Sequence, residues 1–459
     1  MKKCFAFLLA AFGTAFLTCC VDPVEPEPEE LTPLETSLVV DGNWVFQSRP
    51  TITIHAENSN PKAMTAEATV VITTDKKAEV TTITKTVEVA ANSGTDIVLT
   101  TESDLAPGFY RAGCKVNGKG ATIQLKGSKT STIVFGISPE KIVSAPDKQA
   151  DFDSFWDAAK AQLAAIDMKP NLIPIESRSN AACKVYLVEF QSVPDGLSGD
   201  PVTVRGYYCE PQDGKKHPVL MHFFGYDSQN VAYKLDCPYG SANPEYAEFY
   251  LSHRGQYINN RKAKYRVDDG LGDLDNTYGD WFAFNFGNRD GYYYRGAFLD
   301  CAQAVRFMAT RPSSDIGNLF GEGASQGGAL SYAAAALSDY PFTAIAPCVA
   351  FLGDYPDYFQ IVGWPGNTAK EKQGSMTDEQ MYAFLSYFDT KNLATRISCA
   401  VMACSGLQDE TCPPHTNIAP YNNLNSTDKQ YYYYPTMKHE IPGDWSTKMS
   451  KFFKERIRN

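Results

Sequence analysis

Residues 319–330 read LFGEGASQGGAL, and within them Gly323 and Gly327 flank Ser325 two residues away on either side. The short strand-like segment NLF precedes this GxSxG pattern, and a helix-like run follows Gly328. Strand, turn and helix is the context in which such a serine stands out at the carboxyl end of a sheet. A serine hydroxyl is a poor nucleophile until a base takes its proton. Ser325 as a nucleophile therefore requires a histidine and a carboxylate from elsewhere in the chain.

Around this stretch, strand-like and helix-like segments alternate from residue 151 to residue 459. Asp151 is expected to cap the first helix, because apolar residues follow it at helical spacing. The alternation predicts an α/β fold, a mainly parallel sheet with helices on both faces. The strand-like segments are HPVLMHFFG, FTAIAPCVAFL, ISCAVMACSG and QYYYYP, and the helix-like ones are DFDSFWDAAKAQLAAI, RGAFLDCAQAVRFMA, SYAAAAL and KMSKFFKERI.

The order serine, acid, histidine is expected for such a sheet, and of the six histidines only His415 and His439 follow Ser325. His439 comes a short loop after QYYYYP and is predicted to be the base. His415 begins a helix-like stretch after two prolines and is the alternative. Asp409 leaves the end of ISCAVMACSG and is the predicted acid, in preference to Glu410, because adjacent side chains point in different directions.

Residues 37–138 have a different pattern, in which short runs rich in Val, Ile and Thr recur between clusters of Asn, Gly, Pro and Asp. This predicts an all-β immunoglobulin-like sandwich. The region holds a single histidine, His55, so we interpret it as a spacer, with a glycan-binding accessory as the alternative. Residues 139–150 are polar, contain two prolines and are predicted to be a linker.

The first 20 residues, MKKCFAFLLAAFGTAFLTCC, place two lysines before a short apolar run that ends in small residues and cysteine. This is the layout of an export signal, and residues 21–36 form an acidic, proline-rich tether. Together they resemble a bacterial lipoprotein, with Cys20 as the lipidated residue and Cys19 as the alternative. A plain secretory signal is the competing interpretation. The expected location is the cell envelope of a Gram-negative bacterium, lipid-anchored in the outer membrane.

The net charge of -11 and a hydrophobic fraction of 43% indicate an ordinary globular protein and argue against nucleic acid as a partner. After the signal, nine cysteines remain without regular CxxC spacing. An odd number leaves at least one unpaired within the chain. Cys348, Cys399 and Cys404 lie in apolar runs and are expected to be small buried hydrophobes, so no metal site is predicted.

The carboxyl-terminal two thirds of the chain, about residues 151–459, resembles the acetyl xylan esterase and cephalosporin C deacetylase family, carbohydrate esterase family seven. The matching stretches, in order, are DFDSFWDAA, FFGY, HRGQ, YYYRGAFLD, GASQGGAL, AALSDYP, GLQDETCPP and KHE. The resemblance implies an α/β-hydrolase fold, no cofactor, and removal of acetyl groups from sugars. The family commonly forms closed hexamers, so a homo-oligomer is expected, although the added domain and tether could alter its assembly.

The resemblance also implies roles for individual residues. It supports Ser325, Asp409 and His439 as the triad and places the oxyanion hole at the backbone N–H groups of Gln326 and Tyr226. In the HRGQ hallmark, which contains Arg254, Gly255 and Gln256, we interpret the arginine as a structural ion-pair partner. The aromatic stretch 281–296 could line a sugar-binding mouth or pack in the core.

This chain departs from the family pattern at two positions, with Thr411 where an aliphatic residue is more common and Ala350 where a proline is expected near the acyl pocket. The expected substrates are acetylated oligosaccharides such as xylan fragments and other small acetate esters. Two alternatives remain. One is a serine peptidase of the same fold, and the other is a surface glycan-binding protein with an inactive hydrolase domain.

Overall fold

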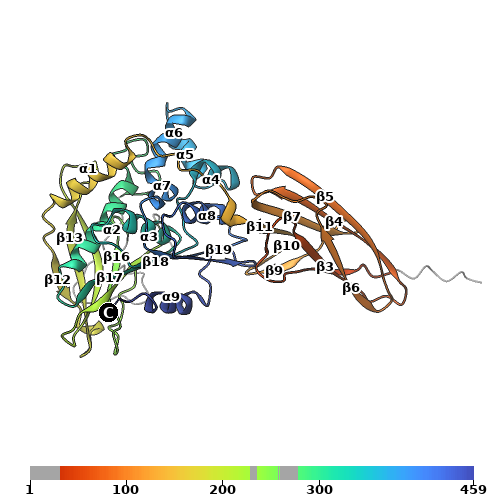
Figure 1. The fold of residues 1–459 in the computed structure, drawn as a ribbon, viewed down its shortest axis with the longest axis horizontal. Helices are drawn as coiled ribbons and strands as arrows, with labels where there is room; N and C mark the ends of the chain where they lie inside the picture. Colours follow the sequence, from red (N-terminus) through yellow and green to blue (C-terminus); the bar gives the residue numbers. More distant parts are fainter. Residues whose placement is uncertain (1–30, 228–234, 257, 259–277, 459) are drawn as a thin grey trace, which may run out of the picture.

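The computed structural model describes residues 31–227, 235–256, 258 and 278–458. Two parts lie side by side in Figure 1: an amino-terminal β region, Glu35–Ile137, and an α/β region that begins at Phe152. We call them the β-domain and the α/β domain. The predicted export signal and its cysteines, Cys19 and Cys20, lie outside the described residues.

The β-domain consists of two facing sheets whose inner residues alternate with outer ones. In β3, for example, Ile52, Ile54 and Ala56 are buried and their neighbours are not, as expected for a half-buried strand. One sheet has the order β1 (Glu35–Val39), β3 (Thr51–Asn58), β6 (Ser93–Thr100). The other has the order β2 (Val45–Phe46), β11 (Thr132–Ile137), β7 (Gly108–Val116), β4 (Met64–Thr74), β5 (Glu79–Val89), with β8 (Lys119–Gly120) paired to β7 and a separate hairpin of β9 (Ile123–Leu125) and β10 (Ser128–Thr130).

The α/β domain is built on a nine-stranded sheet among the described residues. The first three pairings are antiparallel and the remaining five are parallel, which confirms the predicted mainly parallel α/β sheet. Its central strands are buried along their whole length, as their unbroken apolar runs predict. The order is β12 (Asn171–Pro174), β13 (Cys183–Ser192), β14 (Val202–Pro211), β16 (Ala247–Ser252), β15 (His217–Phe223), β17 (Ser314–Ala324), β18 (Ala344–Cys348), β19 (Ala400–Gly406), β20 (Lys429–Tyr434).

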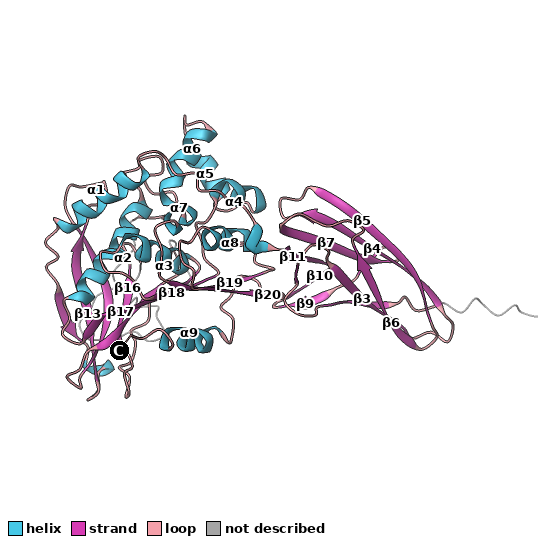
Figure 2. Ribbon diagram, in the orientation of Figure 1, coloured by secondary structure: helices cyan, strands magenta, loops and turns pink. Residues whose placement is uncertain are grey.

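Helices cover both faces of this sheet (Figure 2). Helix α9 (Trp445–Lys454) lies alone on one face in this view, where its Trp445 and Phe453 join the core formed by Phe320 and its neighbours. The other helices pack on the opposite face or above the carboxyl ends of the strands: α1 (Phe152–Ala164), α2 (Tyr293–Ala309), α3 (Gln326–Leu337), α4 (Tyr355–Ile361), α5 (Gly366–Lys372), α6 (Asp378–Leu385), α7 (Thr390–Ala394) and α8 (Pro414–Asn422), with short 3-10 turns at Pro139–Lys141, Glu176–Arg178 and Ser386–Phe388. Within the described ranges, no helix has the length and apolar character needed to cross a membrane.

Two local predictions need correction. Asp151 precedes α1 but makes no capping hydrogen bond; its carboxylate accepts hydrogen bonds from Arg289 and Tyr387 instead. The nine cysteines within the described residues are all free thiols, and Cys399 is only partly buried, whereas Cys348 and Cys404 are buried with their sulfur atoms 3.4 Å apart.

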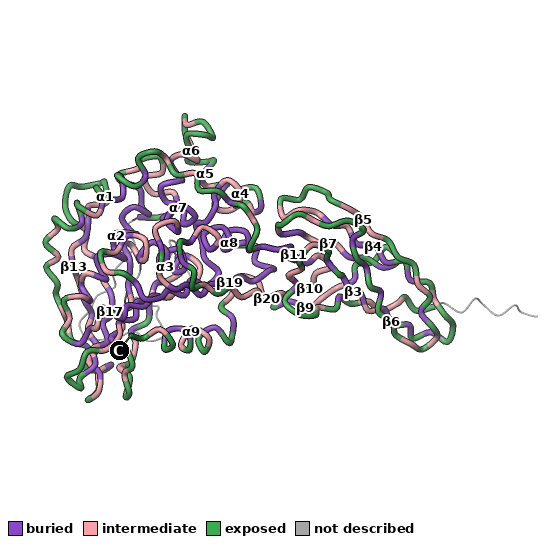
Figure 3. The backbone as a smooth tube through the Cα atoms, viewed as in Figure 1, coloured by how far each residue is buried: buried purple, intermediate pink, exposed green. Residues whose placement is uncertain are grey.

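The β-domain is docked on the α/β domain at the end of the sheet where β19 and β20 finish (Figure 1). The buried segments, purple in Figure 3, fill the centre of the α/β domain and reach α8, which lies beside the β-domain. Even the predicted linker is packed, because Asn422 in α8 donates hydrogen bonds to the carbonyls of Pro139 and Ile142. The β-domain is therefore in direct contact with the rest of the protein, and its role as a spacer stays a prediction.

Candidate active site

Ser325 stands on a sharp turn between β17 and α3, with φ 59° and ψ −123°. A positive φ is strained for a residue with a side chain, and here the turn is held by hydrogen bonds from Ser325 N to Cys348 O (2.9 Å) and from Phe351 N to Ser325 O (3.1 Å). Both flanking glycines are needed because backbone atoms of neighbouring segments lie where a side chain would begin. A Cβ on Gly327 would lie 2.3 Å from Phe223 O, and one on Gly323 would lie 2.5 Å from the backbone of Gly327.

The structure brings the three residues of the predicted triad together in one hydrogen-bonded chain. Ser325 Oγ lies 3.0 Å from His439 Nε2, and His439 Nδ1 lies 2.7 Å from Asp409 Oδ2. The other carboxylate oxygen of Asp409 accepts hydrogen bonds from the backbone N–H groups of Thr411 and Cys412, each at 2.8 Å. The Asp409 side chain has no exposed surface, so its orientation is fixed.

The pKa of His439 reflects this arrangement. Burial lowers its pKa, but the hydrogen bond with the Asp409 carboxylate and the negative charge of that group outweigh burial, and the pKa is raised above its ordinary value of 6.5. Burial also raises the pKa of the Cys412 thiol, which keeps that group neutral at neutral pH. A base with a raised pKa holds a proton taken from Ser325 more firmly.

The two predicted oxyanion donors lie on segments that meet at Ser325. Gln326 is the first residue of α3, where a backbone N–H has no acceptor within the helix. Tyr226 follows β15, whose end at Phe223 lies against Gly323 and Gly327.

A buried histidine missed by sequence reasoning fixes the Gln326 side chain. His253 Nε2 lies 2.9 Å from Gln326 Nε2, and the Tyr294 hydroxyl donates to Gln326 Oε1 at 2.8 Å. Burial lowers the pKa of His253 to about 4, so the ring is neutral and Nε2 can accept from the Gln326 amide. Its Nδ1 lies 2.8 Å from the hydroxyl of Tyr293. The only available signal was that His253 is the first letter of HRGQ.

The next residue of that motif, Arg254, is buried and pairs with Asp300 through two contacts, Nη2 to Oδ1 at 2.7 Å and Nε to Oδ2 at 2.8 Å. Removing one partner of such a buried pair typically costs about 3–5 kcal/mol. Gly255 has φ 76°, a conformation that favours glycine, and Gln256 is buried behind it with its backbone N–H bonded to His253 O.

The aromatic stretch 281–296 packs mainly in the core. Trp281 and Tyr292 to Tyr294 are at most 1% exposed. The ring of Trp281 stacks on that of Tyr293, with 5.4 Å between the ring centroids. The sugar-mouth alternative is therefore wrong for these rings. Trp281 still reaches the site, because its ring contacts that of Tyr226 at 5.3 Å.

Aromatic side chains pack closely around Phe351, a residue that contacts Ser325, because Phe351 N donates a hydrogen bond to Ser325 O at 3.1 Å. Tyr226 contacts the rings of Phe351 and Trp364, which stack on each other at 5.0 Å. Ala350 is 2% exposed and lies against Gly328, so it is part of the packing behind the turn. Thr411 is exposed.

Residues next to Asp409 and His439 bind the β-domain. Gln408 Oε1 accepts from Val134 N at 2.9 Å, and its Nε2 donates to Val134 O at 3.0 Å and to Pro435 O at 2.7 Å. Lys438 Nζ donates to Ser128 Oγ at 2.7 Å, and Glu440 pairs with Lys126 at 2.6 Å. Both loops of the predicted triad are thus attached to the β-domain.

His415, the alternative base, lies elsewhere, in a buried ionic cluster between the domains. Its Nε2 lies 3.0 Å from Asp354 and 3.2 Å from Asp357, and its Nδ1 lies 3.6 Å from Asp75 of the β-domain. Burial lowers the pKa of His415, but these carboxylates outweigh burial and raise it to about 9. A protonated imidazole does not bind a metal ion.

Among the described residues, Asp354, Asp357 and His415 are the group with spacing suitable for a cation. Lys391 pairs with Asp354 at 2.9 Å and Lys76 pairs with Asp357. The cluster therefore supplies its own positive charges, and we assign it a structural role in joining the domains.

Comparison with known proteins identifies the family. Residues 140–456 match the family model described as acetyl xylan esterase (AXE1). The chain is 23% identical over 352 residues to acetyl esterase Axe7A of Xylanibacter ruminicola, covering 75% of this chain and 73% of that protein.

The chain is similar to the solved structure of an acetyl xylan esterase from Paenibacillus sp. R4, with 26% identity and a TM-score of 0.57. The match covers 69% of this chain and 98% of that protein. It is also similar to acetyl xylan esterase 1 from Thermoanaerobacterium sp. JW/SL YS485, with 26% identity, a TM-score of 0.57, and coverage of 70% of this chain and 98% of that protein. The fold is that of the α/β-hydrolase esterases, and the chain belongs to the acetyl xylan esterase family of carboxylic ester hydrolases.

Proposed function

We propose that this esterase removes acetyl groups from acetylated xylan fragments and other small acetate esters through a Ser-His-Asp triad and an acyl-enzyme. The observation that carries the proposal is the hydrogen-bonded chain from Ser325 through His439 to Asp409 at the carboxyl ends of parallel strands. Family membership supports the acetyl ester as the bond that is cleaved.

In the first half of the reaction, Ser325 Oγ attacks the acetyl carbonyl while His439 Nε2 takes its proton. Asp409 holds the Nδ1 proton of His439 and stabilises the imidazolium that forms. The backbone N–H groups of Gln326 and Tyr226 donate to the developing oxyanion. His439 then protonates the departing sugar hydroxyl. Water repeats the sequence on the acyl-enzyme and releases acetate.

The decisive experiment measures acetate released from acetylated xylo-oligosaccharides and from nitrophenyl acetate by the wild type and by Ser325→Ala. The variant should lose activity on both esters and keep its fold, because the hydroxyl forms the covalent bond. Ser154→Ala, which alters an exposed serine on α1, is the matched control and should behave as wild type. Near-normal activity of Ser325→Ala would refute the nucleophile.

The same assay separates the alternatives. Peptide amides turned over as fast as esters would favour a serine peptidase. Sugar binding without turnover would favour a glycan-binding protein with an inactive hydrolase domain.

We further propose that the β-domain is immunoglobulin-like and that the protein is anchored in the outer membrane of a Gram-negative bacterium through Cys20. The two facing sheets, with orders β1-β3-β6 and β2-β11-β7-β4-β5, support the first statement. The lysines, apolar run and cysteine pair of the first 20 residues support the second.

A further inference from the structure

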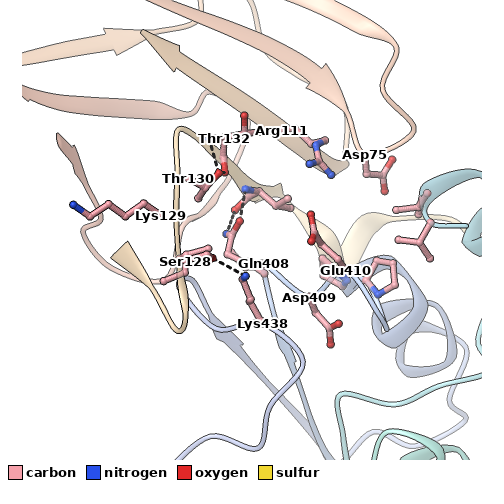
Figure 4. Close-up of a pocket in the computed structure, with 17 residues that line it drawn as sticks. Asp75, Arg111, Ser128, Lys129, Thr130, Thr132, Gln408, Asp409, Glu410 and Lys438 are labelled. Atoms are coloured by element: carbon pink, nitrogen blue, oxygen red, sulfur yellow. Dashed lines mark hydrogen bonds between the residues drawn. The ribbon is translucent and has the colours of Figure 1, made fainter. Parts of the chain in front are cut away.

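A cavity of about 260 Å³ lies between the β-domain and the α/β domain, beside the triad. Arg111, Thr130 and Thr132 line it from the β-domain, and Glu410 and Lys438 line it from the α/β domain (Figure 4). Either domain alone would leave this space as an open surface, so it exists because the two domains are docked.

The cavity is close to the reacting groups. Asp409 is one of its lining residues, and Figure 4 shows the Asp409 carboxylate turned away from the β-domain strands. Lys438, another lining residue, is adjacent to His439, whose Nε2 lies 3.0 Å from Ser325 Oγ. The cavity is therefore lined by the predicted acid itself, Asp409, and by Lys438, the residue that precedes the predicted base in the sequence.

Three charged residues that line the cavity, Arg111, Lys129 and Glu410, have no side-chain partner among the residues that the structure describes. Arg111, half-buried on β7, makes no side-chain hydrogen bond or ion pair with the residues that the structure describes, and neither does Glu410. Polar groups that face a cavity without a partner are available to a ligand.

The rest of the lining suits a sugar. The hydroxyl of Ser128 accepts a hydrogen bond from Lys438 Nζ at 2.7 Å and can still donate its own proton to a sugar oxygen. Ile361, Val362 and Pro413 add an apolar wall for the C–H face of a ring. A small ester such as nitrophenyl acetate has no sugar ring, so it lacks the hydroxyls and the C–H face that this lining would contact.

We propose that the cavity binds a sugar unit of the substrate chain, next to the unit that carries the scissile acetyl group, with Arg111 as a principal hydrogen-bond donor. The inference rests on the proposed function and gives the β-domain a part in selecting oligosaccharides over small esters.

The test compares Arg111→Ala with wild type on acetylated xylo-oligosaccharides and on nitrophenyl acetate. Losing a hydrogen bond from a charged donor should raise the KM for the oligosaccharides about tenfold. The kcat/KM on nitrophenyl acetate should stay within about twofold of wild type. Lys115→Ala removes the same charge from an exposed site four residues along β7, outside the cavity. It should leave KM and kcat/KM unchanged for both substrates.

A second variant, Glu410→Gln, removes the opposite charge and should also raise KM for the oligosaccharides selectively. Equal losses on both substrates, or no loss on the oligosaccharides in either variant, would overturn the inference while leaving the esterase assignment intact. A wild-type protein that hydrolyses neither ester would instead count against the proposed function.

Discussion

Gln408 and Val134, 274 residues apart, are bonded like neighbours in a sheet, because the amide of Gln408 both accepts from and donates to the backbone of Val134. Gln408 is 6% exposed and immediately precedes Asp409. The position of the predicted acid thus depends on a strand of the other domain.

Gln408→Ala should lower kcat about tenfold or more and leave the KM for nitrophenyl acetate unchanged, because displacement of a catalytic group by about 1 Å can cost up to about 100-fold. Lys126→Ala is the control, since Lys126 is 76% exposed and its pair with Glu440 should contribute little. Steady-state kinetics and a thermal melt distinguish the cases. A lower melting temperature with unchanged kcat would show that Gln408 only stabilises the fold.

The pH dependence of kcat/KM should report His439, which must be neutral to accept the Ser325 proton. Because the pKa of His439 is raised above 6.5, activity should rise with pH and the midpoint should lie above pH 6.5. Asp409→Asn removes the charge that raises this pKa, so the midpoint should move to lower pH and the rate should fall by up to about 10⁴. A pH-stat profile of both proteins checks this, and an identical midpoint would argue against the pairing.

Acetyl esters should react faster than butyryl or hexanoyl esters, because Phe351, Trp364 and Tyr226 crowd the space near Ser325. Each extra methylene that does not fit costs roughly 1–3 kcal/mol, so kcat/KM should fall at least about tenfold from acetate to butyrate. A nitrophenyl ester series keeps the leaving group constant. Equal or rising efficiency along it would indicate a general esterase.

Stability should depend on pH through His415. Its pKa is raised to about 9 in the folded protein, against about 6.5 unfolded. Its stabilising contribution is therefore fully present below about pH 6.5 and is lost as pH rises through about 9, by up to about 3 kcal/mol. Denaturant unfolding of wild type and His415→Gln should show a difference that is largest near pH 6 and shrinks by pH 10. A constant difference would contradict the assignment.

Cys20→Ala should move the protein from the membrane fraction to the soluble fraction, because a lipidated cysteine is the proposed anchor. Fractionation followed by immunoblotting measures this. If the variant stays in the membrane, Cys19→Ala should release it, and retention of both variants would exclude the lipoprotein proposal.

Much of the fold and of the candidate site could be predicted from local sequence patterns. GxSxG between a strand and a helix, the two histidines after Ser325, and apolar runs at β18 and β19 were sufficient to predict the sheet and the residues that meet at its edge. The contacts that Gln408, Lys438 and His415 make with the β-domain could not be predicted, because their partners Val134, Ser128 and Asp75 lie more than 250 residues away and no local periodicity encodes such pairings. His253 was missed because its role depends on burial, which lowers its pKa and keeps the ring neutral. The local sequence around His253 does not predict that burial.

The attachment of Lys438 to Ser128 joins residues 310 positions apart, and this separation has a consequence for biosynthesis. Domains generally fold as they emerge, starting from the amino terminus. The β-domain has then already folded when the segment with His439 leaves the ribosome. That segment lies between β20 and α9. Hydrolytic competence therefore arises only after the segment with His439 has been synthesised and has docked on a β-domain that was made much earlier.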